Sequence, residues 1–290
     1  MTSRLSIPST GSVQLGTVGQ QLGINQAGKV QLNTIRSGTG FYWNGTDLST
    51  QGQAGNMNRF RGMNVYTCQQ QTAVTTVGIA SVWVQTQIVG TSNLQVSTQT
   101  GSTLYLRNDQ QLIGKGGIGG GGRGPTQPGL PGQAGQVAIL TQAGIVNVYN
   151  YGSIYGGGGG GGGGGGFALP PAPTGLNAAG GGGGGGGYAG GSGGATAAVG
   201  QAPPVGQGQA GQAATPTGGG NGGSGGTSVS GLGGAGAGGA GVGAGQNGID
   251  GQYGQSGPGV NPQPAGTGGA AGASISGATT VTWVIAGNHN

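Results

Sequence analysis

The sequence is poor in the charged residues on which enzymes and nucleic-acid-binding proteins depend. Charged residues make up 4% of its 290 positions, and the three acidic residues are all aspartates. The formal net charge is +5, but the 8 basic residues are spread thinly before position 124. Nucleic-acid binding needs a clustered basic surface that neutralises phosphates, and Arg59 with Arg61 does not supply one. The composition therefore argues against a nucleic-acid partner.

Cysteine and long apolar runs are also scarce. The single Cys68 excludes an intramolecular disulfide, and we expect it to be a small buried apolar residue. No stretch approaches the ~20 apolar residues of a membrane span. The N-terminal residues MTSRLSIPST contain no apolar core of a signal peptide, so we expect no secretory signal. If the protein works outside a cell, it is expected to leave by another route.

Few titratable side chains are present that would carry catalysis or bind a metal. Glycoside hydrolysis usually uses a carboxylate pair. Asp47 and Asp109 lie in the turn-like contexts NGTD and RNDQ, however, and we interpret both as turn-forming residues. We expect His289 to be a solvated tail residue, and no metal-ligand cluster is visible in the sequence. The sequence thus predicts a protein that is not an enzyme and that uses no cofactor or metal.

Glycine, by contrast, supplies 82 of the residues. It forms one unbroken run at residues 156–166 and a second at residues 180–187. Such runs have no side chains to bury, and glycine loses more backbone freedom on folding than any other residue. The glycine-rich half of the chain is therefore either disordered or ordered by backbone hydrogen bonds alone.

Three structures are compatible with glycine tracts in general. A Gly/Ser linker would be a flexible coil, but a linker has no reason to return to an apolar segment such as ATTVTWVIAG. Collagen needs Gly at every third position over long runs with abundant Pro, and 13 prolines are too few. The third structure is a left-handed extended helix with three residues per turn. Its rise of ~3.1 Å per residue would make residues 156–166 about 34 Å long.

Such a threefold helix has no internal hydrogen bonds, so its N–H and C=O groups must pair with neighbouring helices when they are buried. A fully internal helix requires Gly at all three positions of a turn. A helix at the edge requires Gly only on the faces that touch neighbours. The sequence contains both patterns: pure tracts, and G-x-y triplets such as GQNGIDGQYGQS at residues 245–256. We therefore predict a sandwich or bundle of packed polyglycine-II helices.

The N-terminal region is expected to be mainly β, with essentially no α-helix. Short alternations of apolar residues occur up to about residue 115, without a helical stripe of 3.6-residue period. The segment at residues 104–117 is also similar to that at residues 146–158, with Asn108 matching Asn150 and Ile113 matching Ile154. We interpret each copy as a short strand and a turn that lead into a glycine helix, which implies one structural unit used at least twice.

This combination of features resembles the glycine-rich distal adhesins of T-even-like phage tail fibres. The glycine pattern covers residues 114–277, and its repeats end in I-x-G-G-G. The N-terminal phrases GSVQLGTVGQQLG, VQLNTIRSG and NMNRFRGMN are similar to those of phage virion proteins. In that family an N-terminal attachment region precedes a bundle of polyglycine-II helices, and exposed loops between the tracts contact the host receptor.

The resemblance implies a receptor-binding adhesin at the tip of a tail fibre or tail of the virion. The expected partners are a bacterial outer-membrane protein or surface polysaccharide, and other phage tail or fibre proteins. Residues 1–113 would form a β-rich attachment region, residues 114–277 the polyglycine-II domain, and residues 278–290 a closing strand and tail. The open alternatives are a non-adhesive structural virion protein (a tail-tip or fibre-cap spacer), an ice-binding protein and a fibre-assembly chaperone.

The candidate receptor-binding side chains lie between the glycine tracts, where the few large apolar residues of this half gather. Aromatic and Pro-stiffened segments suit recognition because they offer contact area at low entropy cost. The alternative for the aromatic residues is that they cap the ends of glycine helices. The candidates are Phe167, Leu169, Pro170, Pro171, Leu176, Tyr188, Val199, Pro203, Pro204, Val205, Ile249 and Tyr253.

Overall fold

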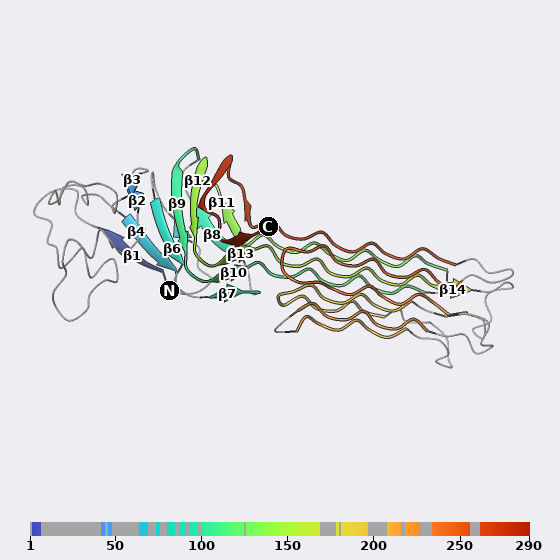
Figure 1. Ribbon diagram of the computed structural model, residues 1–290. Coiled ribbons are helices and arrows are strands. Elements are labelled where there is room, and N and C mark those ends of the chain that lie inside the picture. Colours follow the sequence, from blue (N-terminus) through green and yellow to red (C-terminus); the bar gives the residue numbers. More distant parts are fainter. Residues whose placement is uncertain are drawn as a thin grey trace, which may run out of the picture.

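The computed structural model contains β-strands and extended glycine segments, and no helix within its described residues, which confirms the expected fold class (Figure 1). Apart from a short hairpin at the far end, the strands gather at one end of the molecule, and the glycine segments run away from them side by side. The described residues are 2–6, 42–43, 46–47, 64–68, 74–75, 80–84, 87–90, 93–97, 100–124, 126–168, 178–179, 181–196, 208–215, 218–226, 234–255 and 262–290.

The strands form a parallel β-helix in which each coil contributes one strand to each of three sheets. Equivalent strands of successive coils pair in parallel. The first sheet holds β5 (Val74–Thr75), β8 (Leu94–Ser97), β11 (Ile139–Thr141) and β16 (Ile275–Ser276). The second holds β1 (Thr2–Ser6), β4 (Asn64–Cys68), β6 (Ala80–Val84), β9 (Thr103–Asn108), β12 (Ile145–Asn150) and β17 (Thr280–Ile285). The third holds β7 (Ile88–Val89), β10 (Gln111–Ile113), β13 (Ser153–Tyr155) and β18 (Asn288–His289).

Antiparallel pairing is confined to a few strands in the described part of the chain. Strand β1 pairs antiparallel with β4 at the start of the second sheet. Two short hairpins stand apart from the three sheets: β2 (Tyr42–Trp43) pairs with β3 (Thr46–Asp47), and β14 (Phe167–Ala168) pairs with β15 (Ala178–Ala179). The β-helix itself therefore rests on the parallel ladders between coils.

The internal repeat of the sequence corresponds to two of these coils. Asn108 pairs with Asn150, as the sequence predicts. Ile154, however, pairs with Leu112 and not with Ile113. The turns between the long and the short strand have the same length in both coils, so the register carries through unchanged. It brings Leu112 and Ile154, both fully buried, above one another in the interior.

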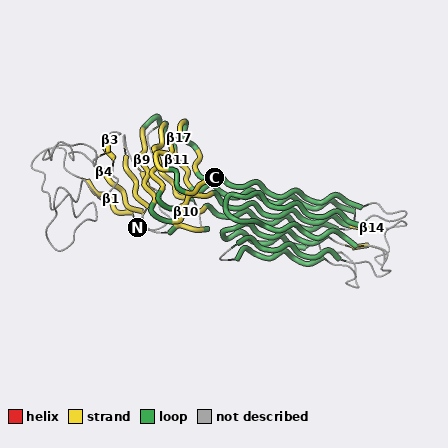
Figure 2. The backbone as a smooth tube through the Cα atoms, viewed as in Figure 1, coloured by secondary structure: helices red, strands yellow, loops and turns green. Residues whose placement is uncertain are grey.

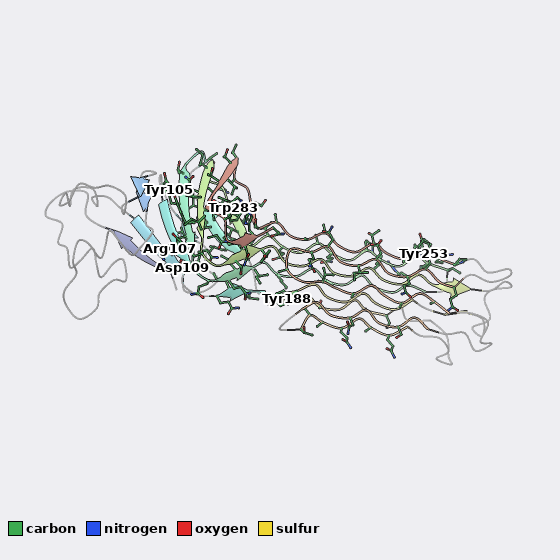
Figure 3. The ribbon with its side chains drawn as sticks, viewed as in Figure 1. Tyr105, Arg107, Asp109, Tyr188, Tyr253 and Trp283 are labelled. Atoms are coloured by element: carbon green, nitrogen blue, oxygen red, sulfur yellow. The ribbon has the colours of Figure 1, made fainter. Side chains whose placement is uncertain are left out.

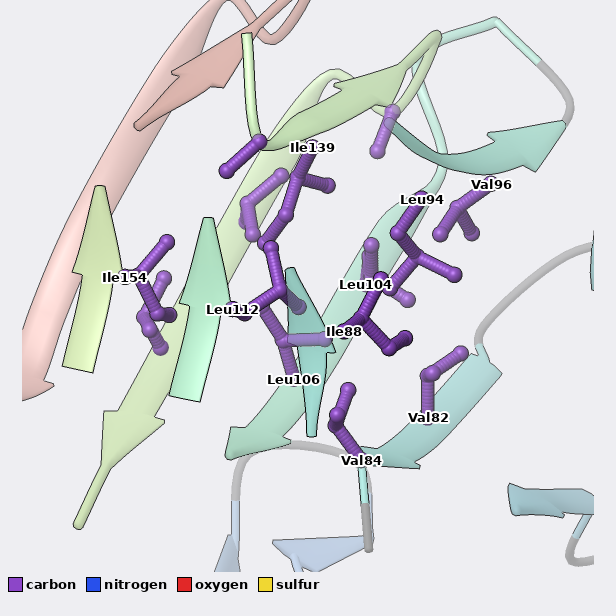
Figure 4. Close-up of a cluster of buried hydrophobic side chains, with 14 residues drawn as sticks. Val82, Val84, Ile88, Leu94, Val96, Leu104, Leu106, Leu112, Ile139 and Ile154 are labelled. Atoms are coloured by element: carbon purple, nitrogen blue, oxygen red, sulfur yellow. The ribbon is translucent and has the colours of Figure 1, made fainter. Parts of the chain in front are cut away.

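Alternate residues of the strands fill the interior of the β-helix (Figure 4). Successive side chains of a strand point to opposite faces, so one residue in two is directed inward. Burying one such Leu, Ile or Val contributes about 1.5–3 kcal/mol. This core is Val82, Val84, Ile88, Leu94, Val96, Leu104, Leu106, Leu112, Ala138, Ile139, Ala143, Val146, Val148 and Ile154.

Two fully buried asparagines hold the corner between the second and third sheets. The Asn108 Nδ2 donates to Asn150 Oδ1 at 2.9 Å and to the carbonyl of Gln110 at 2.8 Å. In the next coil, Asn150 Nδ2 donates to the carbonyls of Ala286 and Asn288, each at 3.0 Å. Buried polar groups of this kind are costly unless they are paired. The stacked side-chain amides therefore pair with the backbone carbonyls of the turns that lie just before the glycine segments.

The glycine segments leave the β-helix as direct continuations of its strands. Gly114 N donates to Tyr155 O at 3.0 Å, Gly117 N to Gly158 O at 2.9 Å and Gly120 N to Gly161 O at 2.8 Å. The ladder between β10 and β13 thus passes into bonds that recur at every third residue. Figure 2 shows these segments extending as parallel undulating lines from the strands. This period of three is that of the polyglycine-II helix.

The two pure glycine tracts are the two central helices of the bundle. Every N–H group of residues 156–166 is paired: Gly156 N donates to Asn290 Oδ1 at 3.0 Å, and the N–H groups of residues 157–166 donate in turn to three neighbouring helices. Carbonyl groups of the same helix accept from three others. Its acceptors lie in 127–137, 182–188 and 246–255, and its donors in 114–124, 234–245 and 262–273. Residues 181–187 are surrounded in the same way by 114–124, 234–243, 208–215, 156–166, 191–196 and 218–226.

The glycine content of each helix follows the number of its neighbours. The central helices, with six neighbours, consist of glycine alone. Helices 114–124 and 234–243 contact four neighbours, and about two in three of their residues are glycine. The other described helices contact three neighbours and keep glycine at one position in three or more, as at 129, 132 and 135. This confirms the prediction drawn from the two glycine patterns.

The glycine segments are insertions between coils of the β-helix, so the range 114–277, predicted to be the polyglycine-II domain, also contains β11 to β13 and β16. The tail differs from expectation. His289 is not a solvated tail residue. It lies in β18 and stacks on Trp283, with ring centroids 3.8 Å apart. The last coil thereby holds the chain close to its final residue.

Adding one methyl group should have opposite effects at two glycines. A Cβ on Gly161 would overlap the carbonyl oxygen of Gly239, whereas the nearest atoms to a Cβ on Gly121 are 3.5 Å away. We expect Gly161→Ala to destabilise the protein by more than about 3 kcal/mol and to impair folding. Gly121→Ala should stay within about 1 kcal/mol, or stabilise, because it restricts the unfolded chain. Thermal unfolding of the two variants checks this, and equal stability would contradict the packing.

Hydrogen exchange should distinguish central from perimeter helices. Amides of residues 156–166 are paired in the interior, so their exchange requires the lattice to open. We expect peptides covering this tract to be among the slowest to exchange in mass spectrometry. Peptides covering residues 246–255, one side of which faces solvent, should exchange faster. Fast exchange throughout 156–166 would mean that the tract is a flexible linker.

Candidate functional site

The end of the bundle furthest from the β-helix, called the distal end below, is where the described glycine helices lead into long connections (Figure 1). Hydrogen bonds hold the residues that flank these connections at the same position along the long axis of the bundle. Gly166 N donates to Gln127 O at 3.3 Å, and Gln263 N donates to Gly166 O at 3.1 Å. Gly181 N donates to Arg123 O at 3.0 Å. The connections therefore leave from one cross-section of the rod.

Connections at the two ends of the bundle differ in length. At the end next to the β-helix, the chain reverses in tight turns at residues 188–190 and 244–245 and between Thr215 and Gly218. At the distal end the longer connections span residues 167–180, 197–207, 227–233 and 256–261. A tight turn has few side chains to offer, so the side-chain variety between the helices is concentrated at the distal end.

Most of the predicted site residues belong to the distal connections. Phe167 begins β14, and the β14–β15 hairpin continues the two central helices. The backbone of Phe167 is thus held by the glycine helix that precedes it and by its pairing with Ala179 across the hairpin. The residues Leu169, Pro170, Pro171, Leu176, Val199, Pro203, Pro204 and Val205 lie outside the described residues, between flanking residues at the distal end.

Tyr188 lies at the opposite end of the bundle (Figure 3). The tract 181–187 runs back toward the β-helix, so the residue after it falls in a turn beside the strands. Ala189 O accepts a hydrogen bond from Gly116 N at 2.7 Å, and the same turn lies against Gly90. The structure does not bring Tyr188 together with the distal connections.

Ile249 and Tyr253 lie on the perimeter helix 246–255 and not in a connection. Their side chains are 53% and 68% exposed. The backbone beneath them is fixed: Ile249 N donates to Ala240 O at 3.0 Å, and Ile249 O accepts from Gly162 N at 2.9 Å. Figure 3 places Tyr253 toward the distal end of the rod. Both side chains are thus presented outward from a rigid backbone.

Two short polar residues on the same helix have a role that the sequence interpretation missed. Asn247 Oδ1 accepts from Ala271 N at 2.8 Å, and Asp250 Oδ1 accepts from Gly268 N at 2.7 Å. Ala271 N and Gly268 N lie at the perimeter, where no further helix supplies a carbonyl acceptor. The side-chain oxygens of Asn247 and Asp250 accept in its place. A short acceptor side chain at a period of three was the signal that could have revealed them.

Asp109 and Asp250 are engaged in structural contacts. Asp109 lies in the turn after β9, and its carboxylate accepts from Arg107 Nε at 2.8 and 3.1 Å. The Arg107 guanidinium also lies 5.2 Å from the ring centroid of Tyr151. Burial raises the pKa of the neighbouring Tyr105 hydroxyl, which keeps it neutral. Within the described ranges, no group of three His, Cys, Asp or Glu side chains gathers as a metal site would require.

The comparisons with known proteins now identify the family. Residues 47–290 match the family described as "Phage tail fibre adhesin Gp38", and the chain therefore belongs to that family. No curated protein matches the chain. A solved structure, the crystal structure of the gp37–gp38 adhesin tip complex of the bacteriophage S16 long tail fibre, is similar at 25% identity. The likeness covers 76% of this chain and 70% of that chain, with a TM-score of 0.32.

Membership of this family defines the role of the protein. It is a receptor-binding adhesin of a bacteriophage, located in the virion at a tail fibre. Among the described residues, no helix has the length and apolar character needed to cross a membrane.

Adsorption should depend little on ionic strength. From residue 124 onward Asp250 is the single formal side-chain charge, and its carboxylate accepts a backbone hydrogen bond. Contacts made by shape and apolar surface are not screened by salt. We expect the adsorption rate of phage to change less than about twofold between 50 and 300 mM NaCl at constant divalent cation concentration. A fall of tenfold or more would show that charged groups dominate recognition.

Proposed function

We propose that the distal connections recognise the host receptor and that the glycine lattice acts as their rigid support. One observation carries this proposal: the long connections leave the bundle at a single level, and the opposite end has tight turns. Binding residues are commonly placed on loops that a rigid scaffold positions. A fixed base also limits the entropy that the loops lose when they bind.

The glycine helices themselves cannot choose between receptors. Their backbones present the same repeated amide groups everywhere, and the central helices have no side chains at all. Discrimination needs side chains of distinct shape. The proposed contact residues are those of 167–176 and 199–205, among them Phe167, Leu176 and Val205, together with Ile249 and Tyr253 on the flank of the rod. Tyr188 lies at the other end and is left out of the receptor contact.

The receptor that suits these residues is a bacterial outer-membrane protein. The proposed segments are apolar and Pro-stiffened, which favours contact with a shaped protein surface. Surface polysaccharide is the second class of receptor for the distal end. The opposite end of the molecule, with the β-helix and residues 1–113, is the part we assign to attachment to another tail or fibre protein.

Replacement of two connections tests the proposal directly. In phage carrying short Gly/Ser loops in place of residues 169–176 and 199–205, we expect adsorption to the same host to be lost. The hydrogen bonds between the described glycine helices do not involve residues 169–176 and 199–205, so we expect the purified variant to unfold at a temperature close to that of the original protein. Retention of β14 and β15 preserves the hairpin that joins the central helices.

The matched control is Ile118→Ser, which alters an apolar side chain, 39% exposed, on another part of the bundle surface. Phage with this substitution should adsorb normally. Normal adsorption of the loop-replaced variant would instead favour the alternative function, in which the glycine bundle is a structural spacer at the fibre tip.

A further inference from the structure

Four of the described glycine helices are continuous with strands of the β-helix, and the others are not. The others form hairpins whose turns lie at the end of the bundle next to the strands. Such a hairpin has no covalent connection of its own to the β-helix, so its place there depends on non-covalent contacts. The continuous helices are 114–124 after β10, 128–137 before β11, 156–166 after β13 and 262–273 before β16.

One hairpin turn, at residues 188–190, packs against the turn that follows β7. Gly116 N donates to Ala189 O at 2.7 Å, and Ala189 is 5% exposed. Gly90 lies against it with a φ of 73°, and a Cβ on Gly90 would lie 2.6 Å from Ala189 Cβ. Strands β7 and β8 are joined by residues 90–93, which are too few for a glycine helix. This coil of the β-helix therefore supports the bundle through contact and not through a connection.

A second hairpin turn, at residues 244–245, packs against Asn290, which follows β18. Gly245 has a φ of 68°, and a Cβ on it would lie 2.9 Å from Asn290 Cγ. Ser274 Oγ donates to the backbone carbonyl of Asn290 at 2.7 Å, which holds the Asn290 backbone in place. Figure 1 marks this end of the chain at the junction between the strands and the glycine segments.

The side chain of Asn290 supplies a carbonyl that helix 246–255 lacks at this point. Every third N–H group of the adjacent central helix donates to helix 246–255, as Gly159 N does to Gln246 O at 3.0 Å. The next N–H group of this series toward the strands is that of Gly156. Helix 246–255 does not extend this far, and Gly156 N donates to Asn290 Oδ1 at 3.0 Å.

The same side chain also supplies the missing N–H group. Helix 246–255 donates to the neighbouring perimeter helix at every third residue, as Gly248 N does to Gly269 O at 2.8 Å. One turn nearer the strands, Gly272 O accepts from Asn290 Nδ2 at 2.8 Å. Because one partner of the amide is a backbone donor and the other a backbone acceptor, they fix which way the amide points. The Asn290 amide thus takes the place of a peptide group in the lattice.

We propose that Asn290 is a positioning residue that fixes the direction of the glycine rod relative to the β-helix. The strands of the third sheet lie in the order β7, β10, β13 and β18. Two covalent connections to the rod leave from β10 and β13, whereas Gly90 follows β7 and Asn290 follows β18. The two packed turns therefore lie on opposite sides of these connections. A rod held in the middle and on both sides cannot rock toward either edge of the sheet without breaking one of the contacts.

The direction of the rod decides where the distal connections stand relative to the part that we assign to attachment. The distal end lies roughly 30 Å from the junction, so a rotation of about 10° there would displace it by about 5 Å. The inference concerns the direction of the rod and does not depend on which residues contact the receptor. A measurement on the purified protein can therefore test it without adsorption.

The distribution of distances between two spin labels tests the assignment in the purified full chain. The labels are attached through Gln95→Cys on β8 and Ser224→Cys on a perimeter helix, both exposed positions, with Cys68→Ala to remove the native thiol. We expect Asn290→Ala to broaden the distribution measured by pulsed EPR about twofold, because it removes both hydrogen bonds of the amide. Asn290→Asp should broaden it as well, because a carboxylate cannot donate to Gly272 O.

Two substitutions serve as matched controls. Asn288→Ala removes an exposed side chain from β18, so it should leave the width of the distribution and the unfolding temperature unchanged. Asp250→Ala removes a bond from Gly268 N further along the rod, so it should lower the unfolding temperature and leave the width unchanged.

Three results would overturn the assignment. An unchanged width in both Asn290 variants would show that the covalent connections alone set the direction of the rod. An equal broadening in Asp250→Ala would show that the loss of any lattice bond loosens the rod. Failure of both Asn290 variants to fold would make Asn290 a residue that the fold requires, and not one that positions a folded rod.

Discussion

The structure depends on one constraint: an extended glycine helix makes no hydrogen bonds with itself, so each buried N–H must find a carbonyl on another helix. Neighbours can approach closely enough only if no Cβ stands between them. A Cβ on Gly161 would overlap Gly239 O, and one on Gly184 would overlap Gly161 O. Tracts 156–166 and 181–187 are pure glycine because each is enclosed by six helices. Perimeter helices, freed on one side, carry side chains there.

The β-helix determines which glycine helices pair and in what register. Packed glycine helices have no side chains to define which helix meets which, or in what register. Here β10 and β13 are already paired in parallel, and their ladder passes into the bonds from Gly117 to Gly158 and from Gly120 to Gly161. On the return path, Gly135 N donates to Ala270 O at 2.9 Å and Ala138 N to Ala273 O at 3.1 Å, which leads into the pairing of β11 with β16. The apolar core of the coils thus fixes the register of segments that contain none.

Local pattern alone was enough to predict the glycine lattice, because the requirement for glycine is set residue by residue through contact. The repeat at Asn108 and Asn150 likewise predicted a strand-and-turn unit used twice, but not that these units belong to coils of a β-helix. The end at which each connection lies could not be read from composition, since it depends on the direction of the helix before it. Tyr188 follows a tract that returns to the strands, whereas Phe167 follows one that leaves them. The large side chains of Ile249 and Tyr253 suggest loop residues, whereas the glycines at 248, 251 and 254 keep the helical period and place both residues on a helix.

The same lattice explains how a fixed scaffold can present different binding surfaces. Each distal connection joins two helices whose places are already set by bonds to other helices, as Gly166 is to Gln127 and Gly181 to Arg123. Lengthening a loop between fixed ends costs little, because the closure entropy grows only with the logarithm of its length. A change on the flank is less free: Asn247 and Asp250 are needed for the bonds they accept. On that flank, therefore, a position such as 253, which accepts no backbone hydrogen bond, can be given to recognition at the lowest cost in stability.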